Sequence, residues 1–593
     1  MSTQLSPWRF RFLKGLVRLF FVIVSYQLIQ LCVIRRPALL AQAEKQHNLK
    51  IEIPAVRGPI LDRNGKELAT SLKVPSIYAV PRILENSEKK NVASLLAKNL
   101  GMDQAVLFKR LEKDKSFVWI KRRVSFEEAE KIRHLNHPAI GILEEYKRFY
   151  PQGDLLSHIL GFVNVDNSGL EGIERALDRE LMGQPGRRYT KRDALGREVK
   201  AYEMKSVPAV NGKKVYLTID QYLQYVTERA LDRAYKKWNA KGAMAIMIEA
   251  DTGRILAMAN RPTFDSNKPG ESNADSRRNR VVTDMYEPGS IFKIVAFSGV
   301  LQEGKAKLED EFFCENGNYR YYGGRVLHDV HPYGMMPFPE ILIKSSNIGS
   351  VKVAALLEPE VFFRYIQSFG FTRLAGIDLP GEAPGFIRSP AQWSKTSPFN
   401  IPIGHETMVT LLQMAMAFDV IANGGELITP FVIAKIEDEA GVTLYEKKKV
   451  VKSRVISEET AKVMREMMTQ VVERGTGTVA RIEGIPVAGK TGTAQKVLSG
   501  GRGYSHDAFM SSFIGFAPSD EPKIVMAVML DNPRPAYYGG VVAAPVFKEA
   551  VEAALYTMGY VPKNASVFNG TADAAAVKPA AAKSAPANPP KRQ

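Results

Sequence analysis

The chain of 593 residues is 45% hydrophobic and 24% charged, which is the composition of ordinary globular domains. This composition excludes an intrinsically disordered chain, and a length of about 150 residues per domain predicts two to four domains. The two cysteines, Cys32 and Cys314, lie far apart, so a disulfide framework is excluded.

The positive charge is concentrated at the two ends of the chain. The formal net charge is +18, of which +7 falls in residues 1–50 and +4 in residues 561–593. This leaves +7 for the 510 residues between them, where no helix-length basic stripe stands out. Nucleic-acid-binding proteins gather their basic residues in a patch or along a helix, so we predict no nucleic-acid partner.

An apolar segment near the start predicts a membrane anchor. Residues 15–34 form a twenty-residue span if Arg18 reaches toward the lipid headgroups, and that length crosses the hydrocarbon core. Residues 1–14 are then a cytoplasmic tail. A buried core helix and a cleaved signal peptide are the alternatives, but Arg35 and Arg36 separate the apolar run from any cleavage site.

The body divides into two parts. Residues 35–214 are charged and mixed α/β, with an Asn64-Gly65 turn that predicts a hairpin, and residues 203–214 read as a polar linker. Residues 215–560 have longer buried elements, and the Ala/Pro/Lys-rich residues 561–593 predict a disordered tail. The elements expected in the second part are strands at 243–248, 255–258, 512–516 and 524–530, and helices at 289–303 and 546–558.

Two Ser-x-x-Lys patterns differ in their surroundings. Ser87 and Lys90 lie in a charged run, which predicts a solvated surface. Ser290 follows a Pro-Gly turn at the start of an apolar helical segment, and Lys293 returns to the same face one turn later. A desolvated lysine can lose its proton and activate a serine nucleophile. An N-cap serine with a surface lysine is the alternative interpretation.

Two further motifs follow in order. Ser345-Ser346-Asn347 begins another helical segment, where a hydroxyl could relay protons and an amide could hold substrate; a helix cap is the alternative. Lys490-Thr491-Gly492 completes the set. Residues 484–491 also satisfy the phosphate-loop pattern, but the extended residues before Lys490 and the glycines after it disfavour the long helix that a phosphate loop opens.

A zinc site is a weaker possibility. The side chains that suggest it are those of Cys314, His328, Asp329 and His331. Their spacing is not that of a standard zinc finger, so we favour ordinary loop residues and predict neither a metal nor a cofactor.

Taken together, the three ordered motifs resemble those of penicillin-binding proteins and serine β-lactamases. The chain is similar over almost its full length to class B penicillin-binding proteins. Residues 57–65, residues 169–174 and Asp193 with Gly196 resemble the signatures of their noncatalytic pedestal. Residues 286–290 and 537–547 resemble the septal, cell-division branch of that class.

The resemblance implies a mixed α/β (α+β) fold in three parts. These are the anchor, a pedestal at 35–214 of the penicillin-binding-protein dimerisation type, and a transpeptidase domain at 215–560. The second domain would resemble serine β-lactamases, with a central antiparallel five-stranded sheet covered by helices.

The resemblance also implies a serine acyl-transfer mechanism without a cofactor. Ser290 would attack the D-Ala–D-Ala carbonyl with Lys293 as base, and Ser345 would help to protonate the leaving amine. The implied binding residues are Asn347 for the donor backbone, Lys490, Thr491 and Thr493 for the terminal carboxylate, Gly492 for close approach, and the Ser290 and Thr493 backbone N–H groups for the oxyanion.

By the same resemblance, the protein cross-links peptidoglycan stem peptides at the division septum and is inhibited by β-lactams. It would sit in the bacterial cytoplasmic (inner) membrane with its catalytic domain on the outer side. Its partners would be a septal glycan polymerase and other division proteins. An elongation-type transpeptidase, a β-lactamase or β-lactam sensor, an inactive division scaffold and a phosphate-loop NTPase remain as alternatives.

Overall fold

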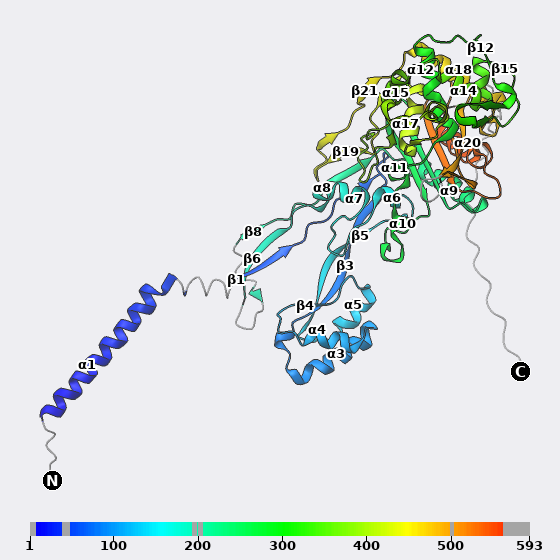
Figure 1. Cartoon of the computed structure of the whole chain (residues 1–593). Coiled ribbons are helices and arrows are strands. Elements are labelled where there is room, and N and C mark those ends of the chain that lie inside the picture. Colours follow the sequence, from blue (N-terminus) through cyan, green and yellow to red (C-terminus); the bar gives the residue numbers. More distant parts are fainter. Residues whose placement is uncertain are drawn as a thin grey trace, which may run out of the picture.

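The computed structural model describes residues 7–37, 39, 48–192, 198–199, 205–497 and 503–560. The tail predicted at 561–593 and the motif Asp193 with Gly196 lie outside the described residues. Figure 1 shows an elongated molecule, with one isolated helix at the N-terminal end and a large globular head at the other.

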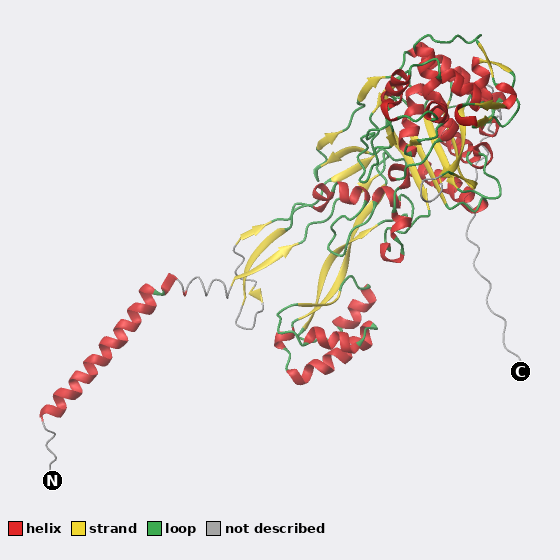
Figure 2. Cartoon of the chain, in the orientation of Figure 1, coloured by secondary structure: helices red, strands yellow, loops and turns green. Residues whose placement is uncertain are grey.

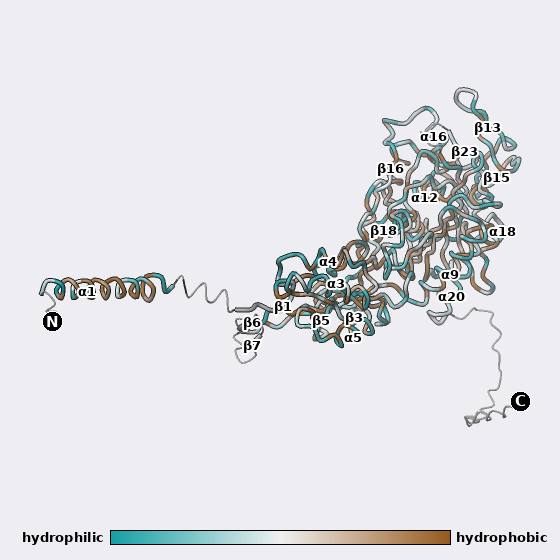
Figure 3. Tube along the Cα trace, turned by 90° about the horizontal axis from the view of Figure 1, so that it is seen from below, coloured by the Kyte–Doolittle hydropathy of each residue, from teal (hydrophilic) through white to brown (hydrophobic). Residues whose placement is uncertain are grey.

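The isolated helix is α1 (Pro7–Ile29), which continues into the π-helical turn η1 (Gln30–Ile34). It begins at Pro7 rather than at residue 15, so the second half of the predicted tail is helical. Together α1 and η1 have 28 residues, Pro7–Ile34, and span about 42 Å at 1.5 Å per residue. This is longer than the hydrocarbon core of a bilayer. The apolar window of the helix is not buried by any of the residues that the structure describes, and Figure 3 shows its apolar character. An N-terminal anchor is consistent with this helix.

Two arms extend from the head (Figures 1 and 2). One arm leads to the N-terminal helix and pairs β1 (Asn48–Ile53) with β6 (Gly186–Arg192), which also pairs with β7 (Glu198–Val199) and β8 (Lys205–Val207). The other arm is an antiparallel pair of β3 (Glu67–Ala79) and β5 (Ile140–Phe149), in register from Thr70–Phe149 to Ala79–Ile140.

A small lobe caps the β3–β5 arm. Its elements are α3 (Asn86–Leu100), α4 (Gln104–Leu111), β4 (Val118–Lys121) and α5 (Phe126–Arg133). Each helix is amphipathic, and their apolar faces meet in a core that includes the fully buried Leu96, Leu107 and Ile120. Ser87 lies exposed on α3, as the charged run predicted, so its Ser-x-x-Lys pattern is a surface feature.

The boundary near residue 215 is crossed by one sheet. The predicted hairpin forms between β2 (Ile60–Leu61) and β3, and β2 pairs in parallel with β9 (Lys214–Leu217). Two strands from much later in the sequence complete the sheet on the other side of β9: β19 (Ile433–Glu437) and then β20 (Thr443–Glu446). The pedestal and the head therefore share backbone hydrogen bonds.

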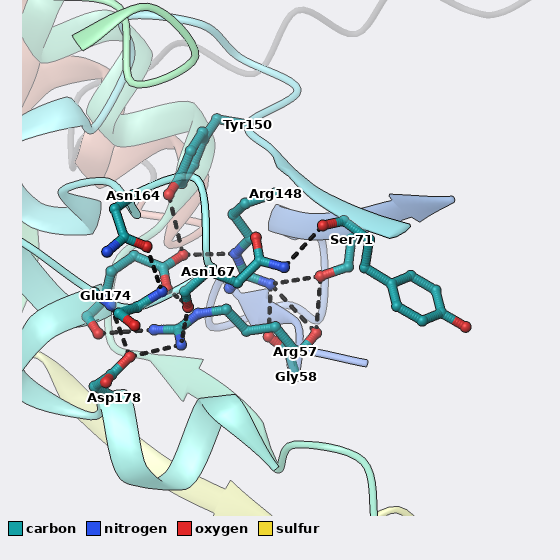
Figure 4. Close-up of polar contacts among 12 residues, drawn as sticks. Arg57, Gly58, Ser71, Arg148, Tyr150, Asn164, Asn167, Glu174 and Asp178 are labelled. Carbon is teal, nitrogen blue, oxygen red and sulfur yellow. Dashed lines mark hydrogen bonds and ion pairs between the residues drawn. The ribbon is translucent and has the colours of Figure 1, made fainter. Parts of the chain in front are cut away.

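A buried ion network fixes the base of the pedestal (Figure 4). Glu174 in α7 (Gly172–Ala176) is fully buried and accepts hydrogen bonds from the Nε atoms of Arg57 and Arg148, both at 2.6 Å. Arg57 also pairs with Asp178 in α8 (Asp178–Met182) at 2.7 Å. A buried charge needs a partner of opposite charge. Arg57 and Glu174 are such partners, and their contact joins the two segments, 57–65 and 169–174, that resemble pedestal signatures.

The head is built on a five-stranded, fully antiparallel sheet in the order β11-β10-β24-β23-β22. Its strands are β10 (Gly242–Glu249), β11 (Arg254–Arg261), β22 (Ala488–Val497), β23 (Tyr504–Ala517) and β24 (Ile524–Asp531). This confirms the predicted sheet and its hairpin.

Helices cover both faces of this sheet. Alternate residues of β10 point to opposite faces: Ala243, Ala245 and Met247 belong to the core beneath α9 (Gln221–Lys237) and α20 (Ala544–Thr557). Their neighbours Met244, Ile246 and Ile248 belong to the larger core that holds α12 (Lys293–Gln302), α17 (Leu411–Ala422) and α18 (Glu458–Arg474). Burial on both faces explains why these strands read as continuous apolar runs.

Candidate active site

The nucleophile candidate Ser290 lies in a tight 3₁₀ turn, η4 (Gly289–Phe292), directly before the buried helix α12. The prediction of helix from residue 289 is therefore right for the segment but not for its first turn. Two glycines hold this turn. Gly289 has φ +64°, and its N–H donates to the Gly404 carbonyl at 3.2 Å. Gly404 has φ +80°, and a Cβ there would meet the Gly289 carbonyl oxygen at 2.2 Å.

Lys293 is fully buried one turn after Ser290. Its Nζ donates to the backbone carbonyl of Ser345 at 2.8 Å and to Asn347 Oδ1 at 2.9 Å, and it reaches Ser345 Oγ at 3.4 Å. Burial lowers the pKa of Lys293 to about 7, against the opposing effect of the Asp329 carboxylate. An amine with such a pKa is substantially unprotonated near neutral pH, as a general base must be.

The Ser-x-Asn motif bridges two helices. Ser345 ends α13 (Phe338–Lys344) in a left-handed conformation with φ +61°, and Asn347 is the first residue of α14 (Asn347–Ala354). Ser346 is the helix cap, because its Oγ accepts from the Gly349 N–H. The capping role thus falls to the middle serine, which leaves the other two side chains of the motif free to face Lys293.

Lys490 completes the cluster from β22. It is fully buried, and its Nζ donates to Ser345 Oγ at 2.8 Å and to the Thr491 carbonyl at 3.2 Å. Burial, with the neighbouring Lys293 charge, lowers the pKa of Lys490 well below its ordinary value. The Ser345 hydroxyl therefore lies between two lysines whose protonated forms are both destabilised.

The rest of the Lys-Thr-Gly strand is shaped for close approach. The Thr491 hydroxyl lies 2.7 Å from that of Thr476, and Thr493 Oγ1 accepts from the Gly539 N–H at 3.2 Å. A Cβ on Gly492 would meet Ser512 Oγ at 2.4 Å and the Pro288 carbonyl oxygen at 3.1 Å, so a larger residue here would displace its neighbours. The segment continues as a strand to Val497, whereas a phosphate loop would open a helix here, and this rejects the nucleotide interpretation.

These side chains line one cavity of about 830 Å³. The predicted residues that line it are Ser290, Ser345, Asn347, Thr491 and Thr493. Lys293 and Lys490 lie buried beneath it and reach it through Ser345. The structure therefore brings together the three motifs, which are separated by up to 200 residues in sequence.

Three further residues belong to the site and were not predicted as such. Asp329 receives the backbone N–H groups of Asn347 and Ile348 on Oδ1 and the Ser346 hydroxyl on Oδ2, so it orients the Ser-x-Asn motif. Thr476 contacts Thr491, and His405 lines the cavity. Asp329 stood in the sequence as a possible zinc ligand, whereas Thr476 and His405 carried no local signal.

The side chains that suggested zinc serve other contacts. Cys314 is buried against the Ser346 hydroxyl, and the Nδ1 atom of His328 contacts Asn318 at 2.8 Å. Within the described residues, no group of three or more His, Cys, Asp or Glu side chains is arranged to hold a metal ion. The carboxylate of Asp329 is used by the start of α14 instead.

Sequence comparisons match both parts of the body. The family model described as the penicillin-binding protein transpeptidase domain matches residues 243–552, and the penicillin-binding protein dimerisation domain matches residues 52–217. The chain belongs to the class B penicillin-binding proteins. Its activity is accordingly that of a serine-type peptidoglycan D,D-transpeptidase.

Two curated relatives and one solved structure show the extent of the similarity. The probable peptidoglycan D,D-transpeptidase PenA of Neisseria gonorrhoeae is 33% identical over 92% of this penicillin-binding protein and 93% of its own length. The peptidoglycan D,D-transpeptidase FtsI of Escherichia coli is 31% identical over 94% and 92%, respectively. Penicillin-binding protein 3 of Mycobacterium tuberculosis, solved with aztreonam, has a TM-score of 0.67 at 28% identity, covering 86% of this chain and 98% of that one.

Proposed function

We propose that Ser290 is the acylated residue and that the two buried lysines move its proton through Ser345. The observation that carries this proposal is the position of the Ser345 hydroxyl, 2.8 Å from Lys490 Nζ and 3.4 Å from Lys293 Nζ, in the cavity that Ser290 lines. Lys293 stands one turn from Ser290 with a pKa near 7 and accepts the hydroxyl proton as Ser290 attacks the carbonyl of the penultimate D-Ala.

The leaving group requires a proton on its nitrogen. Ser345 donates that proton to the departing amine of the terminal D-Ala and is reprotonated from the lysine pair. An acyl-enzyme remains on Ser290. The amine of a second stem peptide then attacks this ester, loses its proton along the same path in reverse, and forms the cross-link while Ser290 recovers its hydroxyl.

The donor peptide is held along β22. Thr491 and Thr493, backed by Lys490, receive the terminal carboxylate, and Asn347 holds the donor backbone. Gly492 lets the donor approach the strand closely. The Ser290 and Thr493 backbone N–H groups form the oxyanion hole. Both residues line the same cavity, which supports this assignment. A β-lactam acylates Ser290 in the same way and leaves slowly.

Labelling with a fluorescent penicillin tests the nucleophile. The full chain is expected to form a stable covalent adduct that Ser290→Ala abolishes and that Ser87→Ala, in the exposed copy of the motif, leaves intact. A label that survives Ser290→Ala would show that another residue is acylated. Rapid release of the label would instead favour a β-lactamase.

We further propose that the enzyme acts at the division septum, anchored by its N-terminal helix with the head outside the cytoplasmic membrane. The sequence around Ser290 and the similarity to FtsI support the septal role. A septal glycan polymerase would bind the anchor and the pedestal. Depletion of the protein should give filamentous cells, whereas rounded cells would indicate an elongation-type enzyme.

A further inference from the structure

A second polar cluster borders the cavity beside the nucleophile turn. His405 follows Gly404, which receives the Gly289 N–H, and its side chain lines the same cavity as Ser290. Nδ1 of His405 lies 3.0 Å from Oε2 of Glu287, the residue three positions before Ser290. The His405 side chain is 23% exposed and that of Glu287 only 9%, and of the two residues only His405 lines this cavity.

The Glu287 carboxylate fixes the orientation of this imidazole. Its Oε1 accepts the Glu406 backbone N–H at 2.9 Å and lies 3.4 Å from the Tyr504 hydroxyl. The Tyr504 ring packs edge-on against the His405 ring at 4.8 Å. With Nδ1–H donated to the carboxylate, Nε2 carries the lone pair on the opposite edge of the ring, in the arrangement by which carboxylate-bound histidines hold cations.

The cluster is acidic. Glu406 contributes a second carboxylate, which accepts from Ser397 Oγ at 2.6 Å and Asn400 Nδ2 at 2.7 Å. Among the described residues, no lysine or arginine forms an ion pair with Glu287 or Glu406. Two carboxylates beside one imidazole favour the binding of a cationic group.

The sheet places this cluster upstream of the scissile bond. β22 is an edge strand, and a peptide that pairs with it has its terminal carboxylate at the Lys490–Thr491 end. The other end is Val497, which pairs with Tyr504 of β23 and therefore adjoins His405. From Thr491 to Gln495 the strand advances about 13 Å, enough for the residues that precede D-Ala–D-Ala.

We propose that His405, oriented by Glu287, binds the side-chain amine of the donor stem peptide and so selects donors with a free amine upstream of D-Ala–D-Ala. This inference rests on the proposed function. An acceptor stem attacks through a side-chain amine, and a donor stem from the same polymer carries the same residue. The ammonium donates to Nε2 while Glu287 and Glu406 supply the compensating charge.

Two matched peptides test the inference on the full chain in detergent. They are Nα-acetyl-L-lysyl-D-Ala-D-Ala, with a free side-chain amine, and its Nα,Nε-diacetyl analogue. Each peptide competes with fluorescent penicillin for Ser290, and the measured quantity is the concentration that halves the labelling rate. One charge-assisted hydrogen bond predicts that the free amine competes about tenfold more effectively.

Substitutions then locate the origin of the preference. His405→Phe keeps a ring against Tyr504 and should bring the ratio of the two peptides to about one. Glu287→Gln should also lower the ratio, whereas a general loosening of the turn would weaken both peptides alike. His134→Phe, on the exposed surface of the pedestal lobe, is the control and should keep the tenfold ratio.

The possible failures are distinguishable. Equal competition by the two peptides, better competition by the diacetyl peptide, or no competition by either would overturn the inference while the labelling of Ser290 left the proposed function standing. A preference retained in His405→Phe would also overturn it. A folded chain that takes no penicillin label would remove the proposed function, and this inference with it.

Discussion

The buried position of Lys293 predicts a specific pH profile for acylation. If its pKa is about 7, the unprotonated fraction is about 1% at pH 5, 50% at pH 7 and 90% at pH 8. The second-order rate constant for labelling by fluorescent penicillin should therefore rise about 50-fold from pH 5 to pH 7 and less than twofold beyond it. A lysine with the ordinary value of 10.5 would instead give a rate that keeps rising tenfold per pH unit to about pH 10.

The assay is stopped-time labelling of the full chain between pH 5 and 9, with the label counted in a gel. Because Lys490 is close and its pKa is also lowered, the observed midpoint belongs to the lysine pair. Lys293→Arg should lose acylation across this range, since a guanidinium keeps its proton. A flat profile, or a rate that still rises tenfold per pH unit between pH 8 and 9, would refute the assignment of Lys293 as the base.

A substitution at Asp329 sharpens this test. The Asp329 carboxylate raises the pKa of Lys293, opposing the effect of burial. Asp329→Asn should therefore move the midpoint below pH 7, although the rate at its plateau falls because the Ser-x-Asn motif loses a partner. Asp114→Asn, in an exposed pedestal ion pair, is the matched control and should leave the midpoint in place. A midpoint that moves upward in Asp329→Asn would contradict the electrostatic account.

Three further substitutions test the packing around these features. Gly404→Ala should slow penicillin labelling at least about tenfold without unfolding the chain, because the added methyl group displaces Gly289. An unchanged labelling rate would mean that the Gly289–Phe292 turn accommodates the methyl group without moving Ser290. Glu174→Gln leaves two buried guanidinium groups short of a counter-charge and should cost about 3–5 kcal/mol, seen as early unfolding of the pedestal in hydrogen exchange. Asp419 is fully buried, and burial raises its pKa from 3.8 to about 7. The free energy of unfolding therefore falls as this group ionises between pH 4 and 7. Asp419→Asn should raise the melting temperature, and more at pH 8 than at pH 5.

Local chemistry explains why the central motifs could be found in the sequence. Ser290 and Lys293 lie one turn apart, so their proximity can be predicted from four consecutive residues. The apolar run that follows indicates that this segment is buried. Four strands of the head were likewise predicted, because burial on both faces gives them apolar runs. The fifth, β22, carries the polar Lys-Thr-Gly residues and has no such run.

Other residues of the site could not be found because their roles arise only from folding. His405 reaches the cavity through the contact of Gly404 with Gly289, and 115 positions separate the two glycines. Asp329 accepts the first backbone N–H groups of α14, a helix that begins 18 residues later. The sheet that joins β2 to β9 and β19 could not be predicted from the sequence either, because strands so distant in the chain pair only through tertiary contacts.

The length of the β3–β5 ladder sets the distance between the small helical lobe and the rest of the pedestal. Its ten consecutive residue pairs span about 30 Å between the base of the pedestal and the small helical lobe. Because side chains alternate with a period of two, removing two residues from each strand would shorten this reach by about 7 Å and keep every remaining side chain on its face. The length of the arm can thus change in steps of two residues while the head keeps its structure. A partner that binds the lobe would lie at a distance from the head that is set by strand length.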